Sequence, residues 1–319
     1  MKHGGDLDAA VARYGGPRDA WLDLSTGINP VATPHTAPPA RAWARLPEAA
    51  DERALDEAAR RAYGVPDRLD VLAVPGTQAV LQVLPRLVPR SDVAVVGPTY
   101  SEHARCWRLA GHRVREVSEP EPADVLVVVN PNNPDGCDRD PAALVDRAPL
   151  TVIDEAFRDT RPERSVLRVR NERTVVLKSL GKFHGLAGVR LGHAIGPPSL
   201  IEPIRDALGP WAVSGPTLHV GRAALAADQG AIARGLRDRA ERLLGILRAM
   251  GVPIVGRTDF FALVRVERAE LIHDRLAERR IWTRRFDDHP GWLRIGLPGD
   301  DGFDRLAAAL REALAAGDS

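Results

Sequence analysis

This 319-residue chain has few cysteines, and we expect it to have no signal peptide. Its two cysteines, Cys106 and Cys137, cannot build the disulfide framework of a small secreted domain, which indicates a reducing compartment. Residues 1–6, Met-Lys-His-Gly-Gly-Asp, include no apolar stretch of the kind that forms a signal peptide. We therefore expect a cytoplasmic protein.

Long hydrophobic runs and an excess of one charge are missing as well. The longest strongly apolar run, Val125–Val129, is far too short to span a bilayer. Basic and acidic side chains number 44 and 43, which gives a formal net charge of +1, and this composition does not favour a nucleic-acid partner. We expect neither a membrane nor a nucleic acid as partner, and no metal site.

The central part of the chain alternates short β-branched runs with helical patterns. A mostly parallel α/β sheet covered by helices on both faces is built from such an alternation, because its strands are buried on both sides. The predicted strands are 71–74, 93–96, 125–129, 151–153 and 174–177, with helices such as 51–63 and 78–87 between them.

The two ends of the chain have a different sequence pattern. After Gly215 we expect one long helical region, 218–250, followed by a smaller α+β domain. That domain contains the predicted strands 261–266 and 292–295 and the predicted helices 271–279 and 302–316. The first forty residues are rich in proline and glycine, with little helix signal, and are expected to form an arm. The prediction is a large domain over 40–230, with 1–39 and 231–319 forming the arm and the small domain.

Turn-forming and polar residues follow several of the predicted strands at their carboxyl ends, where ligands bind in open α/β sheets. Pro75–Gln78 places a glycine at the start of a helix, which is either an ordinary turn or a phosphate site. Asn130–Gly136 holds two Asn-Pro pairs, which also favour a plain turn. Asp154 is either a helix cap or a carboxylate that binds a cofactor cation.

A glycine-punctuated segment follows the last of these strands. Lys182 lies in it, with Ser179 shortly before and Arg190 shortly after. A single lysine in a loop is usually a solvated surface residue, so Lys182 alone indicates little. Lys178 is its only near rival, and we expect Lys178 to lie at the strand end.

Taken together, these motifs resemble a known family. Ser179-Leu180-Gly181-Lys182-Phe183 through Gly188-Val189-Arg190-Leu191-Gly192 resembles the lysine signature of fold-type-I aminotransferases, which depend on pyridoxal 5′-phosphate (PLP). The similarity is greatest to the branch of histidinol-phosphate aminotransferases and threonine-phosphate decarboxylases. Asn133-Pro134-x-Gly136, Asp154, Lys182 and Arg190 occur in the family's order. The resemblance implies the aspartate aminotransferase fold, with a large α/β domain and a smaller α+β domain.

The resemblance also implies a role for each matched residue. Lys182 would carry PLP as a Schiff base, which only a primary amine can form. Asp154 would pair with the protonated ring nitrogen, Asn133 would bind the ring oxygen, and Tyr100 would stack on the ring. His103 would support the carboxylate of Asp154. The residues that would hold the cofactor phosphate are Gly76, Thr77, Gln78, Ser179 and Arg190.

Two positions depart from the broader family. Phe157 stands where many aminotransferases have a tyrosine that bonds the ring oxygen, so one hydrogen bond would be missing. Leu46 stands where a tyrosine often reaches the cofactor of the neighbouring subunit, which weakens the implied homodimer without removing it.

The N-terminal residues favour one reaction. His3-Gly4-Gly5-Asp6 and Leu22–Pro30 resemble the start of threonine-phosphate decarboxylases of cobalamin biosynthesis, although Gly27 stands where some of them have an asparagine. The resemblance implies decarboxylation of L-threonine O-3-phosphate to 1-aminopropan-2-ol phosphate. The implied substrate contacts are His3, Gly27, Asn133, Arg284 (or its neighbour Arg285) and Arg294. Two alternatives remain: an aminotransferase for a phosphorylated amino compound such as histidinol phosphate, and a non-catalytic α/β binding protein.

Overall fold

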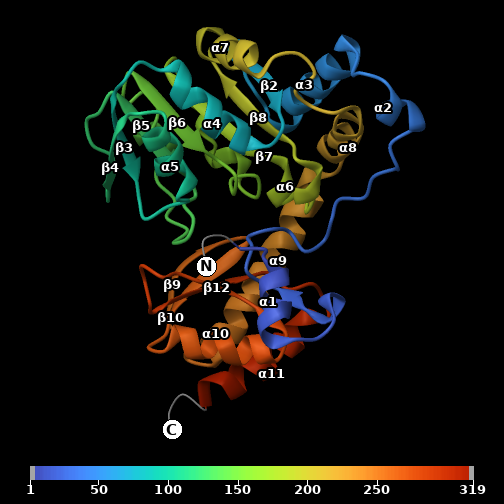
Figure 1. The fold of residues 1–319 in the computed structure, drawn as a ribbon, viewed down its shortest axis with the longest axis vertical. Helices are drawn as coiled ribbons and strands as arrows, with labels where there is room; N and C mark the ends of the chain where they lie inside the picture. Colours follow the sequence, from blue (N-terminus) through green and yellow to red (C-terminus); the bar gives the residue numbers. More distant parts are fainter. Residues whose placement is uncertain (1–3, 316–319) are drawn as a thin grey trace. The chain divides into compact units, whose positions relative to one another are not determined.

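The computed structural model describes residues 4–315 in two compact units (Figure 1). Residues 32–133 and 137–233 form the first, here called the sheet unit. Residues up to 31, 134–136 and those from 234 onward form the second, here called the terminal unit. The predicted domain boundaries near residues 40 and 230 stay a prediction.

A seven-stranded sheet with the order β2-β8-β7-β6-β5-β3-β4 organises the sheet unit. Neighbouring strands are parallel except at β8, which runs antiparallel to both β2 and β7. The mostly parallel sheet is therefore confirmed, and all five predicted strands are present. The strands are β2 Asp70–Val74, β3 Asp92–Val96, β4 Arg113–Val117, β5 Val125–Val129, β6 Leu150–Asp154, β7 Thr174–Ser179 and β8 Gly192–Gly196.

Helices cover both faces of this sheet. Val128, Ile153 and Val176 belong to one buried apolar cluster, which includes residues of α3 and α8. Their chain neighbours in β5, β6 and β7 belong to a second cluster with residues of α4, α5 and α7, as strand alternation requires. None of the helices within residues 4–315 is long and apolar enough to cross a membrane. The helices of this unit are α2 Ala40–Ala44, α3 Ala49–Tyr63, α4 Thr77–Leu87, α5 Glu102–Leu109, α6 Leu180–Phe183, α7 Pro198–Leu208 and α8 Gly215–Ala226.

The terminal unit has the predicted α+β character. An antiparallel sheet, β12-β13-β10-β9, and a parallel pair, β1-β11, are its strands. Helix α9, Gln229–Ala249, continues from the sheet unit into this unit. The strands are β1 Leu22–Asp23, β9 Ile254–Thr258, β10 Phe261–Arg265, β11 Ile281–Trp282, β12 Arg284–Arg285 and β13 Trp292–Gly296. The helices are α1 Leu7–Tyr14, α10 Ala269–Glu278 and α11 Gly302–Ala315, and single 3₁₀ turns occur elsewhere.

Two predictions about helices were wrong. The first forty residues contain α1, whose first turn is capped by the Asp6 side chain accepting from the amide of Ala9 at 3.1 Å. The region 218–250 is two helices rather than one, because the chain leaves the helix after Ala226 and α9 begins at Gln229. The side chain of Asp228 accepts from the amide of Ala231 at 2.9 Å, so it caps the start of α9.

Three buried histidines make the fold sensitive to acid. Burial lowers the pKa of His184 to about 4, of His193 to about 3 and of His273 to about 4, so all three are neutral in the folded protein at pH 7. In the unfolded chain they bind protons from about pH 6.5 downward. A lowered folded pKa means that stability present above pH 6.5 is lost as the pH falls towards 4.

We expect the free energy of unfolding to fall by roughly 1 kcal/mol per histidine for each pH unit below about 6.5. Urea denaturation at pH 7, 6 and 5 measures this loss. His193→Phe should reduce the slope by roughly 1 kcal/mol per pH unit, because it removes one proton taken up on unfolding. Identical slopes in wild type and variant would contradict the assignment. The ring nitrogens of His193 make no hydrogen bond that phenylalanine would remove.

Candidate active site

An anion cradle lies where β2 turns into α4. The turn residue Gly76 has a φ of +75°, and no side chain caps the first turn of the helix, so its amides face outward. A Cβ at Gly76 would lie 2.7 Å from Nη2 of Arg190, which shows how closely this guanidinium approaches the turn. Arg190 also donates from Nη1 to the carbonyl of Ala187 at 3.1 Å. Helix amides and a guanidinium together suit a phosphate group.

Strand β8 brings Ser179 to the same cradle. Gly192 is in register with Val74 of β2 on one side and with Ser179 of β7 on the other. A Cβ at Gly192 would lie 2.9 Å from the amide nitrogen of Thr77, so only glycine permits this approach. The structure thus brings together Gly76, Thr77, Ser179 and Arg190, which the sequence had assigned to the cofactor phosphate.

A buried carboxylate lies at the end of the central strand. Asp154 is only 6% exposed, and its Oδ2 lies 3.1 Å from Nε2 of His103. The amide of Ala156 donates to Oδ1 at 3.0 Å, so both oxygens have a partner. The ring of Tyr100 packs edge-on against His103, and its hydroxyl donates to Oε1 of Gln78 at 3.4 Å. Burial raises the pKa of Tyr100 to about 12, so its phenol is neutral at pH 7.

Three predicted residues follow three adjacent parallel strands. Asn133 comes after β5, Asp154 ends β6, and Lys182 lies in α6 directly after β7. Carboxyl ends of parallel strands meet at one edge of a sheet, which makes this edge the expected ligand site. The α6 turn is tight, because a Cβ at Gly181 would lie 2.7 Å from Cα of Ala187.

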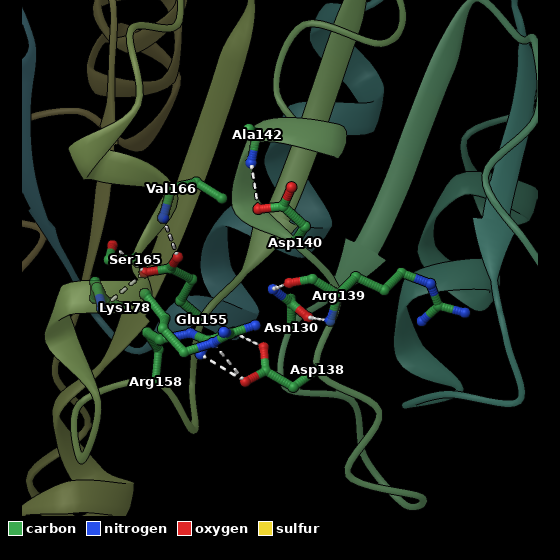
Figure 2. Close-up of polar contacts among 11 residues, drawn as sticks. Asn130, Asp138, Arg139, Asp140, Ala142, Glu155, Arg158, Ser165, Val166 and Lys178 are labelled. Carbon is green, nitrogen blue, oxygen red and sulfur yellow. Dashed lines mark hydrogen bonds and ion pairs between the residues drawn. The ribbon is translucent and has the colours of Figure 1, made fainter.

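Lys178, the other lysine near this edge, is bound to two carboxylates. Lys178 is 2% exposed, and its Nζ lies 2.8 Å from Oε2 of Glu155 (Figure 2). The same Nζ lies 2.9 Å from Oδ1 of Asp159. Burial alone would lower the pKa of Lys178, but attraction to Asp159 and Glu155 outweighs burial and raises it above its ordinary value. The amine of Lys178 is therefore held by two carboxylates, and Lys182 stays the predicted cofactor lysine.

The predicted substrate arginines lie together in the terminal unit. Arg284 of β12 and Arg294 of β13 are opposite one another in the antiparallel register. Arg294 is 6% exposed and donates from Nη2 to the carbonyl of Ser25 at 2.6 Å. Burial, followed by the charge of Arg284, lowers the pKa of Arg294 to about 9, so it remains charged at pH 7. Arg285, the neighbouring candidate, pairs with Glu270.

The N-terminal residues lie beside Arg294 within this unit. The amide of Gly5 donates to Oγ of Ser25 at 2.7 Å, and Ser25 is the residue whose carbonyl Arg294 binds. Gly27 is buried in the turn that follows β1. His3 lies outside the described residues. The structure therefore brings Gly27, Arg284 and Arg294 into one unit, whereas Asn133 belongs to the other.

The residues of the sheet unit fit PLP. The cradle at Gly76 would hold its phosphate, the buried Asp154 would pair with its ring nitrogen, and Lys182 would bind its aldehyde carbon. Phe157 is 5% exposed and offers no polar atom to the ring, while Leu46 is 64% exposed. Within residues 4–315, no group of three or more His, Cys, Asp or Glu side chains is arranged to hold a metal ion.

Sequence reasoning gave no role to Asn132. Its Oδ1 accepts from Oγ1 of Thr99 at 2.6 Å and its Nδ2 donates to the carbonyl of Pro98 at 2.9 Å. These bonds join the loop that carries Asn133 to the segment that carries Tyr100. The only signal in the sequence was the repeated asparagine of Asn130–Asn133, which a plain turn explains equally well.

Comparison with known proteins identifies the family. The family model "Aminotransferase class I and II" matches residues 20–310. Threonine-phosphate decarboxylases from Sinorhizobium sp and Pseudomonas aeruginosa are each 43% identical to this chain, over 97% of the chain and 97% of each relative. The crystal structure of a histidinol-phosphate aminotransferase from Sinorhizobium meliloti in complex with pyridoxal-5′-phosphate has a TM-score of 0.77, at 21% identity, over 97% of this chain and 94% of that one. The chain belongs to the PLP-dependent aminotransferase family of classes I and II, and it has the fold of that family.

Proposed function

We propose that this protein is a PLP-dependent decarboxylase that converts L-threonine O-3-phosphate into 1-aminopropan-2-ol phosphate during cobalamin biosynthesis. The observation that carries the proposal is the 43% identity to two threonine-phosphate decarboxylases over nearly the whole chain. The position of Arg284 directly opposite Arg294 on neighbouring strands supports it. Two arginines suit a substrate with two anionic groups, a carboxylate and a phosphate.

Arg294 would bind the carboxylate and Arg284, with His3, the phosphate. Guanidinium groups form charge-assisted hydrogen bonds to both kinds of anion and can hold them in a fixed orientation. Two anchors rather than one fix the rotation of the substrate about its Cα bonds. That rotation decides which group leaves the α-carbon, so the second anchor favours loss of the carboxylate over loss of hydrogen.

PLP, when bound, supplies an electron sink for the pair of electrons that the departing carbon dioxide leaves at the α-carbon. Asp154 would keep the ring nitrogen protonated, and His103 at 3.1 Å would keep Asp154 in place. Lys182 would hold the cofactor before the substrate binds, and its Nζ would donate a proton to the α-carbon after carbon dioxide has left. Asn133 would bind the ring oxygen.

The alternative is an aminotransferase acting on histidinol phosphate, with the same cofactor residues. One assay separates the two reactions. Purified protein with PLP and threonine phosphate should release carbon dioxide in amounts equal to the 1-aminopropan-2-ol phosphate formed. Efficient transamination of histidinol phosphate by 2-oxoglutarate, with no carbon dioxide released from threonine phosphate, would favour the aminotransferase.

Replacing Arg284 should weaken binding of the substrate phosphate. We expect Arg284→Met to raise KM for threonine phosphate about 10- to 100-fold, the equivalent of one or two lost charge-assisted hydrogen bonds. Arg285→Met is the matched control, because Arg285 is the adjacent arginine and pairs with Glu270 instead. Steady-state kinetics on both variants measure the difference, and equal KM values would remove Arg284 from the site.

The proposal includes a homodimer in the cytoplasm. Trp43 at 70%, Leu46 at 64% and Trp211 at 52% exposure are large apolar side chains left on the surface of the sheet unit. Contiguous exposed apolar patches are typical of surfaces that bind another protein, and we take these three residues as candidates for the dimer surface. Sedimentation equilibrium should give about twice the chain mass of 34.6 kDa, and Trp43→Glu with Leu46→Glu should lower it. A monomer at all concentrations would contradict the proposal.

A further inference from the structure

A group of charged side chains, largely buried apart from Asp138, lies close to the strand ends that carry the predicted cofactor residues. The group consists of Asp138, Glu155, Arg158, Asp159 and Lys178, here called the anchor cluster. Lys178, Glu155 and Arg158 are at most 2% exposed. Nothing in the predicted chemistry uses these side chains, and all of them belong to the sheet unit.

One half of the anchor cluster joins β7 to the segment after β6. Lys178 of β7 lies 2.8 Å from Oε2 of Glu155 and 2.9 Å from Oδ1 of Asp159. Glu155 also accepts from Oγ of Ser165 at 2.6 Å and from the amide of Val166 at 2.7 Å. Figure 2 shows Lys178, Ser165 and Val166 converging on this one carboxylate, which therefore has a partner at both oxygens.

The other half joins the same segment to the loop after β5. Arg158 donates from Nη1 to Oδ2 of Asp138 at 3.1 Å, and its Nη2 is paired with Oδ1. The loop itself is closed at its base, because Nδ2 of Asn130 donates to the carbonyl of Arg139 at 3.1 Å and Oδ1 accepts from its amide at 2.8 Å. Asn133 lies within the loop that these contacts close.

Each anchor residue is close in sequence to a predicted cofactor residue. Glu155 follows Asp154 directly, and Lys178 precedes Ser179. Successive side chains of extended backbone point to opposite sides, so the ion pair lies on the side away from Asp154. The backbones are joined as well, because the amide of Glu155 donates to the carbonyl of Leu177 at 2.9 Å.

Stability alone does not account for such a cluster. The free energy lost when several charges are removed from water offsets much of the free energy gained from their mutual attraction. Apolar residues of similar size often stabilise a fold equally well. An ion pair with directed hydrogen bonds instead fixes the geometry of the residues it joins, because each hydrogen bond requires its donor and acceptor to be aligned. The cluster joins β7 to the segments that follow β5 and β6. Asn133, Asp154 and Lys182 lie at or just after the carboxyl ends of these three strands.

We propose that Lys178, Glu155 and Arg158 are positioning residues that fix the ends of β5, β6 and β7 relative to one another, and so hold Asn133, Asp154 and Lys182 in place for PLP. This inference rests on the proposed cofactor site. Lys178 acts through Glu155 on the neighbouring Asp154, and Arg158 acts through Asp138 on the loop of Asn133.

The test measures the cofactor rather than turnover. Apo-protein variants are titrated with PLP to obtain the dissociation constant, and the visible band of the bound cofactor is titrated with pH. Lys178→Met should raise the dissociation constant about tenfold or more and move the titration midpoint by about one pH unit, because both depend on the placement of Asp154. Lys178→Arg keeps the charge and should restore most of both values.

Asp146→Asn is the matched control. Asp146 anchors the opposite end of β7, where Oδ1 accepts from Oγ1 of Thr174 at 2.9 Å and from the amide of Arg173 at 2.8 Å. This variant should lose stability and leave the dissociation constant and the midpoint unchanged. If Asp146→Asn shifts the dissociation constant and the midpoint as Lys178→Met does, the effect is a general loss of stability and the inference fails.

Ser165→Ala keeps the inference testable if Lys178→Met does not fold, because it leaves the ion pair intact and removes only the hydrogen bond to Glu155 and the one that Ser165 accepts from the amide of Leu167. It should move both values in the same direction by a smaller amount, and unchanged values in Ser165→Ala would overturn the inference. Asp154→Asn separates this failure from that of the cofactor site. If Asp154→Asn changes the midpoint and Lys178→Met, when folded, does not, the positioning role alone is wrong. If neither changes it, the proposed site is wrong.

Discussion

Lys182→Ala is expected to abolish the visible absorption band that PLP gives when bound to a lysine, and to lower kcat by on the order of 10⁴-fold or more. No neighbouring amine can replace it, since Lys178 is protonated and held by Glu155 and Asp159. Absorption spectroscopy of the purified variant with added PLP measures the band, and the carbon dioxide assay measures the rate.

Peptide mapping supplies the independent check on this lysine. After reduction of the PLP-loaded protein with borohydride, the pyridoxyl group should be found on Lys182. Finding it on Lys178 would overturn the assignment. Lys178→Arg is the matched variant, because it removes the second amine and keeps its charge, and it should retain the visible band.

Asp154→Asn is expected to lower kcat by on the order of 10²-fold while the cofactor still binds. An asparagine leaves the ring nitrogen without an anion, so the neutral ring is favoured and takes up electrons less readily. The phosphate cradle at Gly76 and Arg190 is untouched by this change, which is why binding should persist. The measurements are kcat from the decarboxylation assay and the PLP dissociation constant.

His103 provides the graded control for the carboxylate. His103→Gln can still donate one hydrogen bond to Asp154, so it should lower kcat less than Asp154→Asn does. Turnover near the wild-type value in Asp154→Asn would remove the proposed role of this carboxylate, whatever the His103 variant does.

Much of the sheet unit could be predicted from the sequence, because its signals are local. Buried parallel strands such as Val125–Val129 are continuous apolar runs, and all five runs of this kind proved to be strands. Polar residues immediately after a strand necessarily lie at its carboxyl end, so Asp154 and Asn133 could be placed from the strand prediction alone. The family resemblance added the order of the motifs, which no single motif carried.

The parts that could not be predicted depend on contacts between distant residues. Strand β4, Arg113–Val117, is an edge strand rich in charged residues, and β8, Gly192–Gly196, begins and ends with glycine, so neither has the expected apolar pattern. Helix α1 depends on packing of Ala10 against Trp21 and against Ala277 and Trp282, and the last two are far away in the sequence. Lys178 was recognised only as a rival to Lys182, because nothing local indicates that Glu155 and Asp159 enclose it.

The antiparallel strand β8 has a consequence for how the protein acquires its cofactor during synthesis. In the sheet order, β2 is bonded to the rest of the sheet only through β8, so the turn at Gly76 cannot meet Ser179 until Gly192–Gly196 is in place. A ribosome-bound chain that ends before residue 192 therefore lacks one wall of the phosphate cradle, although every other cradle residue has already been made. PLP would be captured late, only after β8 has emerged and inserted between β7, made shortly before it, and β2, made long before it.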